Sequence, residues 1–177
     1  MSETSPAAAT IGRLCATVPD YPEPGIIFKD LTPVFADGAA LREVVDALVA
    51  PFAGRFDAVA GVEARGFLLA AAAAYATGTG MITVRKAGKL PRALFTERYA
   101  LEYGKAALEI HQGDVAAGTR VLLLDDVLAT GGTLGVAVRL LERAGADVTG
   151  IGVVLELASL PGRAALAGHH VESLVTV

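Results

Sequence analysis

Cysteine and long apolar segments are scarce in this 177-residue chain. The single cysteine, Cys15, excludes an internal disulfide and supplies no cluster of thiolate ligands for a metal. The longest apolar run, Phe67 to Ala76, has ten residues, whereas a membrane-spanning helix needs about 20. The first residues lack the basic and apolar regions of a signal peptide. From these absences we expect a cytoplasmic protein without a membrane partner.

Familiar phosphate-binding and nucleophile motifs are also missing. No lysine follows a glycine-rich loop, and neither G-x-G-x-x-G nor G-x-S-x-G occurs. The net charge of −4 argues against a nucleic acid partner. Charge is unevenly spread, however, because the segment from Arg85 to Lys105 holds six basic and only two acidic residues. Such a segment favours a small anionic ligand, although on charge alone a solvated basic loop explains it equally well.

The remaining sequence is organised as one domain. No repeat, linker or change of composition divides residues 1–177, and the small, polar residues 1–10 predict a disordered tail. Strands are predicted at 26–28, 56–61, 81–85, 108–112, 121–125 and 148–157, helices at 38–53, 66–76 and 134–144, and a long loop at 90–102. This alternation is typical of an α/β fold with a mainly parallel sheet, in which ligands bind beyond the carboxyl ends of the strands.

The strongest chemical signal is the segment VLLLDDVLATGGT at residues 121–133. An apolar strand leads into Asp125 and Asp126, and a turn of small residues then leads into a helix. Backbone N–H groups of such a turn and the helix dipole bind phosphate, and the hydroxyls of Thr130 and Thr133 are further donors. The carboxylates repel phosphate and suit ribose hydroxyls or hydrated Mg²⁺. The segment therefore predicts a sugar phosphate ligand, with its phosphate on Ala129, Thr130, Gly131, Gly132 and Thr133.

This segment closely resembles the 5-phosphoribosyl 1-diphosphate-binding motif of the type I phosphoribosyltransferases. Four further stretches, in the family's order, are similar to the members that use adenine: YPEPGIIFKD at 21–30, GVEARGF at 61–67, VRKAGKLP at 84–91 and LEYGK at 101–105. The resemblance implies a mainly parallel sheet flanked by helices, a small N-terminal hood at residues 19–35 and a flexible loop at residues 90–105. It also implies a homodimer in which each chain converts adenine and 5-phosphoribosyl 1-diphosphate to AMP and pyrophosphate, in purine salvage, with Mg²⁺.

The resemblance also implies residue roles in binding and chemistry. The diphosphate is expected at Glu63, Ala64 and Arg65, in a loop of a kind that often holds a non-proline cis peptide. Arg85 and Lys89 are expected to neutralise its charge, while Lys86 fits a solvated side chain as well. The loop at residues 90–105 is expected to close over the substrates and exclude water. Glu102 is the expected catalytic carboxylate, with Arg65 as the second catalytic residue and Tyr103 as a loop residue. The resemblance gives no direct protein ligand to the metal.

Adenine is expected between the hood and Leu128. The apolar side chains of Ile27 and Leu128 suit its flat face, and backbone groups of Ile27 and Lys29 suit its edge, whereas Phe28 is expected to be core. Members that use 6-oxopurines place an Asp immediately before the Thr-Gly pair, and here that position is Ala129. The hood stretch does not resemble an orotate enzyme. A non-catalytic ligand sensor remains an alternative, but such proteins usually carry a DNA-binding segment.

The histidines and the cysteine are weaker candidates. His111, His169 and His170 have no matched partner in a catalytic motif, so we expect them to be structural or surface residues. Cys15 is expected to be incidental to the chemistry.

Overall fold

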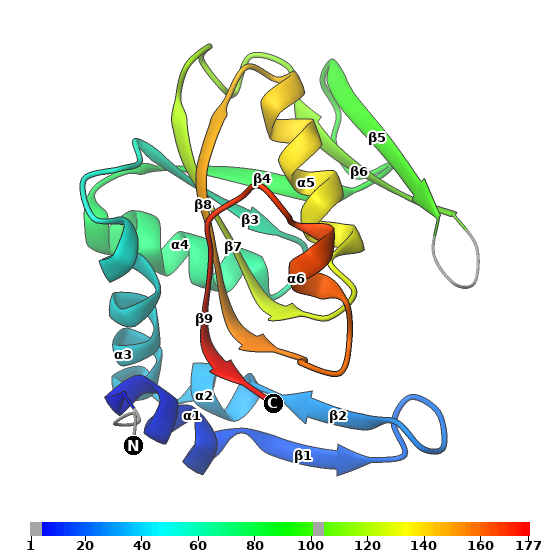
Figure 1. Cartoon of the computed structure of the whole chain (residues 1–177). Coiled ribbons are helices and arrows are strands. Elements are labelled where there is room, and N and C mark those ends of the chain that lie inside the picture. Colours follow the sequence, from blue (N-terminus) through cyan, green and yellow to red (C-terminus); the bar gives the residue numbers. More distant parts are fainter. Residues whose placement is uncertain (1–4, 101–104) are drawn as a thin grey trace.

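Seven strands form the central sheet of the protein (Figure 1). The computed structural model describes residues 5–100 and 105–177. The sheet order is β5-β6-β4-β3-β7-β8-β9. Strands β4, β3, β7, β8 and β9 run parallel, and β6 and β5 join antiparallel at one edge. The strands are β3 (Ala58–Val62), β4 (Gly80–Lys86), β5 (Leu94–Ala100), β6 (Lys105–His111), β7 (Arg120–Leu128), β8 (Asp147–Glu156) and β9 (Val171–Thr176). The mainly parallel α/β sheet expected from the sequence is confirmed.

Helices cover both faces of this sheet because its central strands are apolar on both sides. Along β7, Val121 and Leu123 point into one hydrophobic core, and Leu122 and Leu124 point into the other. The first core is shared with α5 (Gly132–Arg143). The second is shared with helices α1 (Pro6–Leu14), α3 (Gly38–Val49) and α4 (Gly66–Thr77). A 3₁₀ turn (Ala50–Phe52) follows α3, and the short helix α6 (Gly162–Ala165) precedes β9.

A separate two-stranded hairpin lies where the hood was expected. It pairs β1 (Ala16–Pro19) with β2 (Ile27–Asp30) and is followed by α2 (Thr32–Ala36). Figure 1 shows this hairpin beyond the carboxyl ends of β7 and β8, which is the side on which ligands bind in parallel sheets. The hairpin is thus placed to cover a ligand at that edge.

The N-terminal segment differs from the expected disordered tail. Helix α1 begins at Pro6, the Oγ of Ser5 accepts a hydrogen bond from the N–H of Ala8, and Ala7 and Ile11 are buried. A serine N-cap followed by proline is a favourable helix start. The expectation was therefore wrong for Pro6 to Thr10, because burial of one apolar face orders this segment.

The prediction of a long loop at residues 90–102 is wrong for residues 94–100, which form strand β5. Its residues pair with β6 in seven consecutive positions, from Leu94 with His111 to Ala100 with Lys105. The guanidinium of Arg143 on α5 donates to the carbonyl of Thr96 and lies 5.4 Å from the centre of the Phe95 ring. Tertiary contacts with α5 thus stabilise a strand whose sequence shows little periodicity. Glu102 and Tyr103 lie outside the described residues.

The other elements follow the expected order with shifted ends. Strand β7 continues through both aspartates to Leu128 instead of ending at Asp125. Helix α6 and strand β9 were not expected at all. Across 5–100 and 105–177, no helix has the length and apolar character that crossing a membrane requires.

Candidate active site

The segments singled out in the sequence meet at one edge of the sheet. Strands β4, β3 and β7 are adjacent and parallel, so their carboxyl ends bring Arg85, Glu63 and Asp125 to the same side. The residues at the carboxyl ends of these three strands therefore lie at one edge of the sheet.

The turn after β7 forms a small open pocket of about 90 Å³. Its lining comprises Asp125 and all residues from Val127 to Leu134. Gly131 has a φ of +79°, a conformation that favours glycine, and its carbonyl accepts from the N–H of Gly135 as α5 begins. The first N–H groups of a helix have no partners within the helix. The pocket therefore offers backbone donors and two threonine hydroxyls to an anion, as the sequence predicts.

Asp125 and Asp126 lie buried beside this pocket. One carboxylate oxygen of Asp125 accepts from the N–H of Asp126 at 2.9 Å. Burial, reinforced by the charge of Asp126, raises the pKa of Asp125 well above its ordinary value. Asp126 Oδ2 is buried without a hydrogen bond of good geometry from the described residues. Asp125 thus places carboxyl oxygens in the lining of the pocket, with Asp126 next to it in the chain.

Arg65 connects the aspartates to the hairpin. Its Nε lies 2.7 Å from Asp126 Oδ2, and its NH1 lies 3.9 Å from Asp30 Oδ1 on β2. The guanidinium also lies 5.5 Å from the centre of the Phe28 ring. Arg65 immediately precedes α4, where Gly66 packs closely against β7: a Cβ there would lie 2.9 Å from the carbonyl oxygen of Leu124. The Arg65 side chain is therefore fixed between two acids.

Glu63 holds the basic residues that follow β4. Its Oε2 accepts from the backbone N–H of Lys86 at 3.0 Å and lies 3.5 Å from Arg85 Nε, while its Oε1 accepts from Lys89 Nζ at 2.5 Å. The hydrogen bond from Lys89 lowers the pKa of Glu63 below its ordinary value. The peptide bond between Glu63 and Ala64 is cis, as the resemblance led us to expect. Sequence reasoning did not find that Glu63 pairs with Arg85 and Lys89.

The residues expected near the base are less closely assembled. Ile27 is 64% exposed, whereas Leu128 is buried in the wall of the pocket. Lys29 donates from its side chain to the Oγ1 of Thr17 across the hairpin. Phe28 was expected to be core, but it belongs to neither core cluster and packs edge-on against Tyr21 at 5.2 Å. A two-stranded hairpin has no second layer of side chains that could bury Phe28. Its ring is therefore not enclosed in a core and lies near Arg65.

Histidines have structural contacts away from this site, as expected. His111 lies between Arg92 and Asp114, with distances of 2.9 and 3.0 Å from its Nδ1. His170 contacts Arg55 and Glu172, and its ring lies 5.1 Å from the Phe52 ring in a tilted arrangement. None of these contacts reaches the pocket after β7.

The fold and the pocket are those of a phosphoribosyltransferase, and comparison with known proteins agrees. Residues 34–165 match the model of the phosphoribosyl transferase domain. Adenine phosphoribosyltransferase of Renibacterium salmoninarum is 78% identical over 165 residues, which are 93% of this chain and 91% of the relative. The corresponding enzyme of Clavibacter michiganensis is 67% identical over the whole of both chains. This chain therefore belongs to the adenine phosphoribosyltransferase family.

Solved structures of this family share the architecture. The enzyme of Thermoanaerobacter pseudethanolicus superposes with a TM-score of 0.91 at 42% identity, covering 96% of this chain and 99% of the other. The enzyme of Saccharomyces cerevisiae superposes with a TM-score of 0.88 at 35% identity, covering 95% and 99%. The yeast structure holds an imino-altritol bisphosphate and adenine. The type I phosphoribosyltransferase fold expected from the sequence is thus confirmed.

Proposed function

We propose that this chain transfers the 5-phosphoribosyl group of 5-phosphoribosyl 1-diphosphate to adenine, releasing AMP and pyrophosphate in purine salvage. The observation that carries the proposal is the buried Asp125–Asp126 pair, locked to Arg65, beside a pocket built from backbone donors. This arrangement joins acceptors for a sugar diol to donors for a phosphate. The 35% to 78% identity to adenine phosphoribosyltransferases supports adenine as the acceptor.

The donor fits the site in one orientation. Its 5-phosphate lies on Ala129, Thr130, Gly131, Gly132 and Thr133, none of which is acidic. Its ribose hydroxyls then reach Asp125 and Asp126. Its diphosphate extends toward Glu63, Ala64 and Arg65, with Arg85 and Lys89 as the neighbouring cations. Because Glu63 already holds Lys89, the diphosphate must draw this lysine away from Glu63.

Adenine is placed between the hairpin and Leu128. The exposed side chain of Ile27 and the buried side chain of Leu128 provide apolar surface, and backbone groups of Ile27 and Lys29 provide donors and acceptors for the edge of the ring. Ala129 cannot offer the carboxylate that members using 6-oxopurines place before the Thr-Gly pair. Adenine is therefore the purine that this pocket suits.

The site suits Mg²⁺ carried by the substrate. Within the described ranges, no group of three or more His, Cys, Asp and Glu side chains could hold a metal directly. Mg²⁺ retains several waters and commonly binds through substrate phosphates with one or two carboxylates nearby. Asp125 and Asp126 are two such carboxylates. When bound, the ion neutralises charge on the leaving diphosphate.

The chain itself acts by positioning and by fixed charge. The bond between C1′ and the diphosphate oxygen breaks as a purine nitrogen bonds to C1′, so negative charge grows on the diphosphate and positive charge on the sugar. Arg65, Arg85 and Lys89 stabilise the first charge, and the aspartates hold the ribose. We assign Glu102 to the proton of the base or to the cationic sugar. Glu102→Ala should lower kcat by about 10²- to 10⁴-fold, with KM for the donor little changed.

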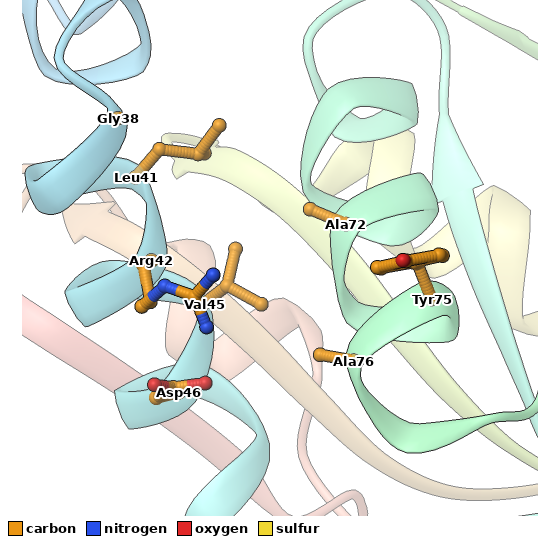
Figure 2. A pocket seen from close by; sticks show the side chains of 8 residues that line it. All are labelled: Gly38, Leu41, Arg42, Val45, Asp46, Ala72, Tyr75 and Ala76. Atoms are coloured by element: carbon orange, nitrogen blue, oxygen red, sulfur yellow. The ribbon is translucent and has the colours of Figure 1, made fainter.

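A homodimer is part of the proposal. Helix α4 exposes Leu68 and Tyr75, which is 92% exposed. Figure 2 shows a mainly apolar pocket where Leu41 and Val45 of α3 face Ala72 and Ala76 of α4, with Arg42 and Asp46 also in its lining. An apolar surface of this kind marks a protein interface. Light scattering should give twice the chain mass, and Tyr75→Asp should give a monomer.

The single cysteine fits the cytoplasm, where thiols stay reduced.

A substrate panel tests the function. The purified chain is given 5-phosphoribosyl 1-diphosphate and Mg²⁺ with adenine, hypoxanthine, guanine, xanthine or orotate. Efficient turnover of adenine alone, lost after chelation of the metal, supports the proposal. Comparable turnover of a 6-oxopurine would mean that the pocket does not select adenine. Absence of turnover with all five would favour a ligand sensor, and full activity without metal would overturn the role given to Mg²⁺.

A further inference from the structure

Helix α6 lies directly behind the turn that binds the phosphate in the proposed function. A Cβ added at Gly131 would lie 2.6 Å from the carbonyl oxygen of Gly162 and 2.8 Å from the Cβ of Ala165. A Cβ added at Gly162 would overlap the carbonyl oxygen of Ala129 and lie 2.8 Å from Leu128 Cδ1. The two backbones therefore touch without a side chain between them. Displacement of α6 must displace the turn.

An ion pair between the exposed Arg163 and the buried Glu156 holds α6 in this place. Arg163 donates from Nε and NH2 to the two carboxylate oxygens of Glu156, at 2.8 and 2.5 Å. Its NH1 donates to the carbonyl of Val171 and its NH2 to the Oγ of Ser173, both on β9. The hydrogen bonds from Arg163 lower the pKa of Glu156, so this carboxylate stays charged near neutral pH. An arginine that donates two hydrogen bonds to one carboxylate fixes both the orientation of the two side chains and the distance between them.

Glu156 is itself tied to the turn. It ends β8, where it pairs in register with Leu128, the last residue of β7. The next N–H, of Leu157, donates to the carbonyl of Leu128 at 3.0 Å. The ion pair thus connects the end of β8, which is paired with the end of β7, to helix α6. Helix α6 itself packs behind the turn.

We propose that Gly162 and the Arg163–Glu156 pair are positioning residues that set the backbone of residues 129–133 for the 5-phosphate of the donor. The inference rests on the proposed function, which places that phosphate on this turn. The turn consists of small residues, and its donors are backbone groups whose direction no charged side chain of its own controls. Contact from α6 supplies that control, and a shift of 1 Å in such a site can cost about 100-fold.

Gly162→Ala tests the contact, and Gly150→Ala is the matched control. A Cβ at Gly150 would overlap the Phe52 ring, which is an equally tight contact in the amino-terminal half of β8. We expect Gly162→Ala to raise KM for the donor and Kd for ribose 5-phosphate by about 10- to 100-fold with kcat within about twofold. Gly150→Ala should lower the melting temperature and leave both constants unchanged. Equal effects in the two variants would overturn the proposal.

The arginine pair gives a second test that does not require a new side chain in the contact. Arg163→Met should raise the same two constants, and Arg163→Lys should restore part of the loss. Arg120→Met is the control, because Arg120 makes a comparable two-pronged pair with Asp57 at the amino end of β7. If folded Gly162→Ala and Arg163→Met bind ribose 5-phosphate like the wild type, the proposal is wrong although the function stands. If the wild type neither binds it nor turns over adenine, the proposed function fails and this inference with it.

Discussion

The turn after β7 and the loop after β3 are both assigned to phosphate groups, but they are built differently. The turn from Val127 to Leu134 contains no charged side chain, and its shape comes from a left-handed glycine and close backbone packing. The loop region relies on Glu63, Arg85 and Lys89, which are long side chains paired with one another. Lys89 is 47% exposed at its side chain, whereas that of Glu63 is 10% exposed.

The turn is a preformed site, because its donors are already in place. The loop region is a neutralised site, because its cations are already paired with Glu63. Backbone donors in the turn are fixed before the ligand arrives, so binding there requires little rearrangement. In the proposed function, the cations of the loop region exchange Glu63 for the diphosphate. Such an arrangement suits a group that must leave as pyrophosphate after the reaction, while the 5-phosphate remains bound throughout. Variants should therefore respond differently in the two regions.

Arg65 links the two regions, and among changes in the turn and the loop region its removal should have the largest effect. Arg65→Ala leaves Asp126 buried without its cation and takes a positive charge from the diphosphate. We expect kcat/KM for the donor to fall by about 10²- to 10³-fold, mainly through KM. Arg65→Lys keeps the charge but not the geometry and should recover only part. Steady-state kinetics on variants shown to be folded by circular dichroism decide this, and a loss below threefold for Arg65→Ala would contradict the assignment.

Gly131→Ala should give the next largest effect and should act on the turn alone. The positive φ costs an L residue about 1–2 kcal/mol, and the new methyl would meet the carbonyl oxygen of Gly162. KM for the donor should rise roughly 10-fold or more with kcat little changed, and added salt should not remove the difference. Gly135→Ala on the same helix is the control, because a Cβ there would find only ordinary contacts at 3.7 Å and beyond. Similar KM values for the two variants would show that the turn is not preformed.

Lys89→Met should have a smaller effect that depends on salt. Its partly exposed pair with Glu63 is typical of surface ion pairs, which contribute about 0–1 kcal/mol. We expect the Kd for pyrophosphate to rise about threefold to fivefold at low ionic strength, and the difference should shrink as salt screens the charge. Lys86→Met serves as the comparison, since a solvated side chain explains Lys86 as well as a role in binding does. Calorimetric titration at two salt concentrations measures this, and an effect of equal size at both would place Lys89 in a desolvated contact.

The smallest effects concern the free energy of unfolding. The contributions of the two regions to this free energy should depend on pH in opposite directions. Burial raises the pKa of Asp125, so its contribution is favourable below the ordinary carboxyl pKa and is lost as pH rises through the folded pKa. Asp125→Asn should therefore be more stable than the wild type at neutral pH. Lys89 lowers the pKa of Glu63, whose contribution is present above the ordinary pKa and is lost as pH falls. Glu63→Gln should be less stable at neutral pH. Thermal unfolding between about pH 4 and 8 should show that the stability difference between each variant and the wild type becomes smaller toward low pH. Stability differences of the same sign for Asp125→Asn and Glu63→Gln at neutral pH would contradict the account.

The sequence predicts the turn better than the loop region for the same physical reason. Residues 121–133 are contiguous, so strand, acids, glycines and helix start can be recognised together. The pairing of Arg65 with Asp126 and of Glu63 with Lys89 joins segments 26 or more residues apart, and only the fold brings them together. Strand β5 and the position of Phe28 were missed because neighbouring elements, not local periodicity, determine them. Gly162 and Arg163 lie outside the recognised motifs and gain their meaning from contact with the turn.

A crystal structure of the chain with AMP tests the central claim most directly. The account predicts that the nucleotide phosphate binds the backbone N–H groups of residues 129–133, that the ribose hydroxyls lie at Asp125 and Asp126, and that adenine lies between the β1–β2 hairpin and Leu128. A phosphate bound elsewhere in the complex, with this turn unoccupied, would contradict it.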